Sequence, residues 1–154
     1  GVMRVSRDLG DNARVIETAD RLLASSALGA SGKREVAFTK ALALADTDRG
    51  GEAVAIWESL ADDIDDLYGT KSAFNLAAHY ADSGQDAKAL EAVNRLIDAN
   101  PPHDYWLARG FILLSDLLRR KGDTFEADEY LRSLKQNYPG NEADIFRMID
   151  DRLH

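Results

Sequence analysis

The stretch "GQDAKALEAVNRLIDANP" (Gly84–Pro101) begins with a helix breaker, carries apolar residues at helical spacing and ends at a proline. Without gaps it aligns with "GDNARVIETADRLLASS" (10–26) and "GDTFEADEYLRSLKQNYP" (122–139), and more weakly with "DRGGEAVAIWESLADDID" (48–65). The copies recur every 36 or 38 residues. Repetition at such a period indicates an array of similar helical units.

Each copy has the pattern of the second helix of a pair, because three apolar positions recur in it, four and then three residues apart. A small residue at the first position lets two helix backbones approach closely, and larger residues fill the groove beside it. These sets are Val15, Ala19 and Leu22; Ala53, Trp57 and Leu60; Ala89, Val93 and Leu96; and Ala127, Leu131 and Leu134. The segments before them predict first helices, with stripes at Ala37, Ala41 and Leu44; Ala73, Leu76, Ala77 and Tyr80; and Phe111, Leu114, Ser115 and Leu118.

Together the two helices of a pair show one order of residue types: a large residue, Leu followed by a small residue, an aromatic residue, then Gly, Ala and Pro. This order resembles the tetratricopeptide repeat. It is carried by Leu76-Ala77, Tyr80, Gly84, Ala89 and Pro101, and again by Phe111, Leu114-Ser115, Leu118, Gly122, Ala127, Leu131 and Pro139.

The resemblance implies an all-α fold, a right-handed α-α superhelix of about three helix pairs with a leading half-repeat and a C-terminal capping helix. The block from residue 105 to 141 is similar to the final repeats of long bacterial tetratricopeptide proteins, so we expect the C-terminal part of a longer solenoid with half a pair missing upstream. We predict one domain over 1–154, made of a half-repeat at 1–28, repeats at 34–67, 70–103 and 108–141, and a capping helix at 142–153.

Three local features add expectations. Asp48 stands where the other pairs have the turn glycine, which puts the geometry of that turn in question. Asp104 and Asn141 are predicted as side-chain N-caps of the helices that follow them. The helix from about residue 104 is apolar almost all round, which predicts that it lies between several neighbours.

Composition excludes several classes of function. The net charge of −8 disfavours nucleic acid, whose phosphates require clustered Lys and Arg. No apolar run approaches the roughly 20 residues that span a bilayer. The absence of cysteine removes disulfides, thiolate nucleophiles and Cys-based metal sites. Composition leaves the compartment unknown; the resemblance slightly favours the periplasmic side of the bacterial cell envelope over the cytoplasm.

No arrangement of residues predicts chemistry, so we expect no catalytic residue, no metal site and no cofactor. The three histidines, His79, His103 and His154, have no histidine partner at helical spacing. The loop at 46–52 resembles a calcium loop only in its first residues, and "LGASGK" (28–33) lacks both the preceding strand and the spacing of a phosphate loop. The sequence therefore favours a protein that is not an enzyme.

A concave groove lined by the first helices remains as the candidate site, for a peptide or helix of a partner protein. The resemblance implies that its lining includes Phe38, Leu42, Lys71, Phe74, Asn75, Ala78, Arg109, Ile112, Asp116 and Arg119. Only Asn75 fits the clamp that some family members use for a terminal carboxylate, so we expect no such clamp. An apolar strip with a few cations suits a helix, or an extended segment in which apolar and acidic residues alternate.

The alternative is a structural or self-assembling C-terminal segment of a larger solenoid. In that case the strip would be covered by upstream repeats, by the terminal helix of the chain itself, or by a second copy in a homodimer.

Overall fold

The computed structural model describes residues 2–153, and the side chains of residues 10–153. This part of the chain forms eight α-helices and no strand, which confirms the all-α prediction. The helices are α1 (Val2–Ala24), α2 (Ala30–Asp46), α3 (Gly50–Ala61), α4 (Leu67–Asp82), α5 (Asp86–Ala99), α6 (Asp104–Lys121), α7 (Thr124–Asn137) and α8 (Ala143–Arg152).

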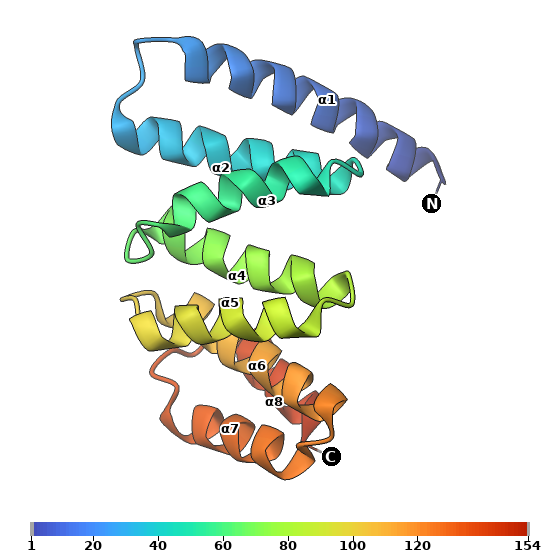
Figure 1. The fold of residues 1–154 in the computed structure, drawn as a ribbon, viewed down its shortest axis with the longest axis vertical. Coiled ribbons are helices and arrows are strands. Elements are labelled where there is room, and N and C mark those ends of the chain that lie inside the picture. Colours follow the sequence, from blue (N-terminus) through green and yellow to red (C-terminus); the bar gives the residue numbers. More distant parts are fainter. Residues whose placement is uncertain (1, 154) are drawn as a thin grey trace. The chain divides into compact units, whose positions relative to one another are not determined.

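The chain divides after Asp62 into two compact units, where the sequence predicted one domain over 1–154. The first unit holds α1 to α3 and the second holds α4 to α8. Within each unit, consecutive helices run in alternate directions (Figure 1). The predicted repeats fall on packed helix pairs, α2 with α3, α4 with α5, and α6 with α7.

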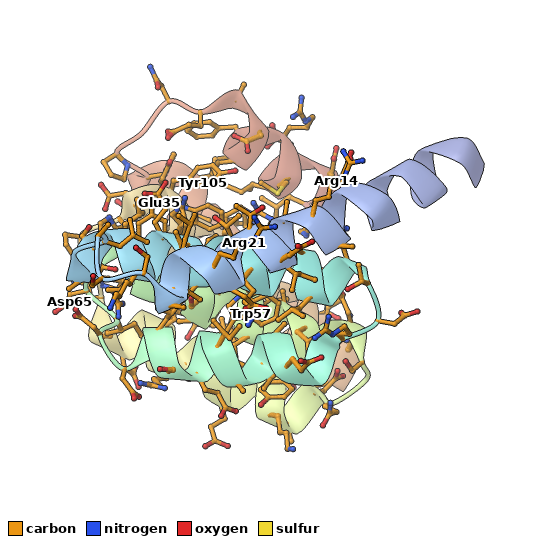
Figure 2. All side chains as sticks on the ribbon, turned by 90° about the horizontal axis from the view of Figure 1, so that it is seen from above. Arg14, Arg21, Glu35, Trp57, Asp65 and Tyr105 are labelled. Atoms are coloured by element: carbon orange, nitrogen blue, oxygen red, sulfur yellow. The ribbon has the colours of Figure 1, made fainter. Side chains whose placement is uncertain are left out.

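In the first unit, α2 packs against both α1 and α3. The buried residues of α2 are Phe38, Ala41, Ala43 and Leu44, and Trp57 lies on the side of α3 that faces α2 (Figure 2). Two long side chains add polar links: the Arg34 guanidinium donates to the carbonyl of Leu60 at the end of α3 (2.9 Å), and Lys40 pairs with Asp20 of α1 (2.6 Å). A cation at the carboxyl end of a helix also interacts favourably with the helix dipole.

The second unit is built around α6, which contacts α4, α5, α7 and α8 and so confirms the prediction that it lies between neighbours. One buried cluster joins α4, α5, α6 and α7 and includes Ala77, Ala89, Val93, Leu114, Leu117, Leu118 and Ala127. A second joins α6, α7 and α8 and consists of Ala108, Ile112, Leu131, Ile145 and Ile149. The terminal helix therefore contributes to the core of this unit.

The turn between the helices of each pair has the same backbone in all three pairs. Gly84 and Gly122 have φ of 75° and 98°, and Asp48 at the matching position has φ of 59°. The left-handed region is nearly free of strain for glycine, and Asp is among the few other residues that enter it with some regularity. The turn at Asp48 therefore keeps the left-handed geometry of the other two turns, although Asp is less suited than glycine to that backbone conformation.

Both predicted side-chain N-caps are wrong. Helix α6 already includes Asp104, and His103 precedes it without a side-chain cap bond. Helix α8 begins at Ala143 after Glu142, one residue beyond the position that Asn141 would need, and it also lacks a side-chain cap bond. A carboxylate inside the first turn still interacts favourably with the helix dipole, which accounts for Asp104 at that place.

We predict that Gly122→Ala lowers the free energy of unfolding by about 1 kcal/mol, because a Cβ is strained in the left-handed region. Gly51→Ala is the matched control, since Gly51 has open space at its Cβ position and no positive φ. It should be neutral or slightly stabilising in urea unfolding. Asp48→Gly should stabilise the protein; equal effects of all three substitutions would contradict this account of the turn.

Candidate partner-binding site

Helices α4 and α6 are the two first helices of the second unit, and they lie side by side. Six side chains from these helices gather on one shared face, four of them aromatic and two cationic. We call them the cation–aromatic cluster: Tyr68, Lys71, Phe74, Tyr105, Trp106 and Arg109.

On α4, Lys71 follows Tyr68 by three residues and precedes Phe74 by three, so the three side chains lie along one face. The Lys71 Nζ atom lies 5.5 Å from the ring centroid of Tyr68 and 5.6 Å from that of Trp106. The rings of Phe74 and Trp106 have centroids 5.7 Å apart and join the two helices. Phe74 is 8% exposed, so it is the buried base of the cluster.

On α6, the guanidinium of Arg109 lies over three rings. Its Cζ atom is 4.8 Å from the ring centroid of Phe74, 5.6 Å from that of Trp106 and 5.9 Å from that of Tyr105. The Nη1 atom of Arg109 donates to the Tyr105 hydroxyl at 3.4 Å, and that hydroxyl donates to Asp144 Oδ2 at 2.6 Å. Tyr105 therefore stands between the cation and the nearest carboxylate.

These contacts shift the pKa values of Tyr105 and Asp144. The hydrogen bond to Asp144 is the main cause that raises the pKa of Tyr105 above its ordinary value, and burial adds to it. The same bond is the main cause that lowers the pKa of Asp144, with a smaller contribution from the charge of Arg109. Both shifts keep Tyr105 as a donor and Asp144 as an acceptor at neutral pH.

Helix α8 packs along α6 on both sides of Arg109, at Tyr105 and Ala108 before it and at Ile112 and Asp116 after it. Ile112 is 3% exposed and belongs to the buried cluster with Ile145 and Ile149. Asp116 accepts from Nε and Nη2 of Arg152 at 2.7 and 3.0 Å, and this bond is the main cause that raises the pKa of Arg152. Two residues predicted for the groove, Ile112 and Asp116, are thus occupied by contacts within the chain.

Arg119 is held in the same region. Its Nη2 atom donates to Asp128 of α7 at 2.7 Å and lies 3.5 Å from the carbonyl oxygen of Arg152. We therefore leave Arg119, with Ile112 and Asp116, out of the candidate surface. The physical reason is that the terminal helix α8 packs against α6 and α7, and cover by the terminal helix is one of the alternatives that the sequence left open.

The remaining predicted residues fall into two groups. Asn75 donates to the backbone carbonyl of Lys71 at 3.0 Å, within its own helix, and Ala78 is half-buried on α4. Phe38 and Leu42 lie on α2 in the first unit, where Phe38 is buried and Leu42 is 41% exposed. Their role in binding stays a prediction. The structure brings together Lys71, Phe74 and Arg109 from the predicted set.

Sequence reasoning did not select Tyr68, Tyr105 or Trp106 for this site. A signal was present, because Tyr68 and Lys71 are three residues apart, as are Trp106 and Arg109, and Tyr105 and Arg109 are four apart. Such spacings place two side chains on one helix face. The contact between Phe74 and Trp106 had no such signal, because it depends on how α4 and α6 pack.

The second unit also contains an apolar groove of about 320 Å³ between α6 and α7. Phe111, Tyr130 and Leu134 form much of its wall, and Tyr138 lies at one end. Burial, and then a hydrogen bond to Glu142, raises the pKa of Tyr138. This groove can hold an apolar side chain, but it brings no cation together with its rings.

Two further findings concern the whole described chain. No three His, Asp or Glu side chains among residues 10–153 are grouped so that they could hold a metal ion. No helix in the described part is both long and apolar enough to cross a membrane.

Comparison of the chain with protein-family models, with curated proteins and with solved structures finds no match. The likeness to tetratricopeptide repeats therefore rests on the residues of this sequence alone and stays a prediction.

We predict that Tyr105→Phe raises the pKa of Asp144 towards its ordinary value, because the phenyl ring has no hydroxyl to donate. A pKa lowered by folding contributes stability that is present above the unfolded-state pKa and is lost as pH falls through the folded-state value. The variant should therefore lose less stability than the wild type on acidification. Carboxyl NMR titration measures the shift, and Tyr80→Phe, remote from Asp144, should leave it unchanged.

Proposed function

We propose that the chain is a non-enzymatic protein-interaction scaffold, built as a right-handed tetratricopeptide-like solenoid, which binds a peptide or helix of a partner protein on the face of its first helices. The observation that carries this proposal is the cation–aromatic cluster on α4 and α6. Within it, Lys71, Tyr105, Trp106 and Arg109 are only partly buried.

The composition of the cluster supports a binding role. Trp, Tyr and Arg are the residues most enriched at the centres of protein interfaces, where they combine large apolar area with a polar group. Both ring contacts of Trp106, with Phe74 and Tyr105, limit its motion before a partner arrives. A side chain that is already ordered loses less conformational entropy on binding.

A displayed library of random peptides, selected against the protein, tests this function. We expect peptides that bind the wild type and lose at least about tenfold in affinity with Trp106→Ala, since truncating a central aromatic side chain often costs about 1.4 kcal/mol or more. Phe125→Ala is the matched control, because Phe125 is the most exposed aromatic among the described side chains and lies outside the cluster. Peptides that bind both variants equally, or no enriched peptides, would count against the proposal.

A second candidate, self-assembly, is favoured by an open groove of about 370 Å³ between α1 and α2. Leu22 in this groove is 40% exposed, whereas Leu96 at the matching place of α5 is fully buried. On α6, Gly110 faces Leu96 so closely that a Cβ would lie 3.0 Å from it, while Val36 occupies the matching place on α2. Leu22 and Val36 both line this groove, and Arg14 and Glu35 lie along it (Figure 2).

If this groove holds a second copy, sedimentation should show association that increases with protein concentration. Leu22→Glu should abolish it, because a carboxylate is costly to bury in an apolar contact. Phe125→Glu is the control, since Phe125 is exposed and lies outside this groove. A wild type that stays monomeric at every concentration would rule out self-assembly through this surface.

A further inference from the structure

From the position of Arg109 we infer the chemistry of the partner: an acidic segment in which a carboxylate pairs with Arg109 while an adjacent aromatic or aliphatic side chain packs on Trp106. This inference rests on the proposed function and specifies what the cation–aromatic cluster recognises.

Most arginines on the helices around the cluster have a carboxylate partner. Arg119 pairs with Asp128 at 2.7 Å, Arg120 with Asp86 at 2.9 Å, and Arg152 with Asp116 at 2.7 Å. Arg109 differs: among the described residues it has no carboxylate within ion-pair distance, and its contacts are three aromatic rings and one hydroxyl.

This arrangement is unexpected in a chain with 27 acidic and 19 basic residues, in which carboxylates are plentiful. A partly buried guanidinium has lost part of its hydration, and cation–π contacts compensate for only part of that loss. Of the five N–H groups of the Arg109 guanidinium, one donates to the hydroxyl of Tyr105 at 3.4 Å. Arg109 can therefore form a charge-assisted, two-bond contact with a carboxylate that arrives from outside.

The cluster also defines what lies next to that carboxylate. The Arg109 Cζ and Lys71 Nζ atoms are both 5.6 Å from the ring centroid of Trp106, so two cations border one half-buried indole. An apolar side chain packed on the indole would bring an adjacent carboxylate of the same segment within reach of Arg109. Charge complementarity thus selects an acidic segment with interspersed apolar residues over a basic or purely apolar one.

The Tyr105 hydroxyl explains why the nearby Asp144 does not satisfy Arg109. That hydroxyl donates to Asp144 at 2.6 Å and accepts from Arg109, so the acid reaches the cation only through the phenol. The guanidinium is held in place, and its charge is not cancelled by a direct contact. Such preorganisation reduces the entropy lost when a ligand binds.

The test uses a synthetic peptide in which four Glu alternate with three Phe, acetylated and amidated, and two counterparts with Gln or Lys in place of Glu. Binding is followed by ¹⁵N NMR through the Arg109 Nε–H and the Trp106 indole N–H. The Trp57 indole, in the first unit, serves as an internal control within the same sample. We expect the Glu peptide to shift the Arg109 and Trp106 signals and to bind about tenfold more tightly than the Gln peptide, as one charge-assisted contact would give.

Two variants make the assignment specific. Arg109→Gln should remove the preference for Glu over Gln, and so should high salt, since charges are screened within about 3 Å at 1 M. Arg132→Gln, which breaks an exposed pair with Glu129 on α7, should leave the preference intact. Far-UV circular dichroism confirms that each variant is folded.

Equal binding of the Glu and Gln peptides, a preference for Lys, or a preference that survives in Arg109→Gln would overturn the inference. Failure of all three peptides to move the Arg109 and Trp106 signals would overturn it as well. The proposed function fails separately, when library selection yields no peptide whose binding depends on Trp106. Peptides that depend on Trp106 but carry no acids would leave the scaffold proposal standing and remove this one.

Discussion

The close approach of paired helices at one alanine per pair is the constraint on which the rest of the structure depends. Ala53, Ala89 and Ala127 are fully buried at the matching place of the second helices. A methyl group there lets the helix backbones lie close enough for the larger residues four and seven positions later to fill the space alongside. With that spacing fixed, α4 and α6 become neighbours on either side of α5, and the cation–aromatic cluster can form between them.

The sequence predicted the elements that depend on local pattern. Small and large apolar residues at helical spacing identified the paired helices, because each stripe must be buried by whatever packs on it. Asp48 put the geometry of its turn in question, yet the backbone there is left-handed, as it is at Gly84 and Gly122. The packing of the two helices outweighs a local strain of the order of 1 kcal/mol. The failed caps, Asp104 and Asn141, are one-residue errors at helix ends, where pattern carries least information.

The candidate site was only partly predictable, because it depends on contacts between distant residues. The Ile112 and Asp116 positions were expected to face a partner, and the terminal helix covers them through Ile145, Ile149 and Arg152. Asp116 and Arg152 are 36 residues apart, so no local sequence pattern predicts that they pair. Tyr105 and Trp106 belong to the helix that is apolar almost all round, and periodicity alone does not say which flank of such a helix has a neighbour.

The arginines of the second unit differ in their partners: some pair with carboxylates of another helix, whereas Arg109 contacts aromatic rings. Arg120 joins α6 to the end of α4 and the start of α5, through the Ala81 carbonyl and Asp86, and Arg152 fixes α8 on α6. Loss of Arg120 would remove the cation paired with Asp86, and loss of Arg152 would remove the cation paired with Asp116. Arg109 holds nothing of this kind, because the rings beneath it already contact one another, Phe74 with Trp106 and Tyr105 with Trp106. Arg109 contacts three rings and one hydroxyl and no carboxylate, which agrees with the acidic partner proposed above.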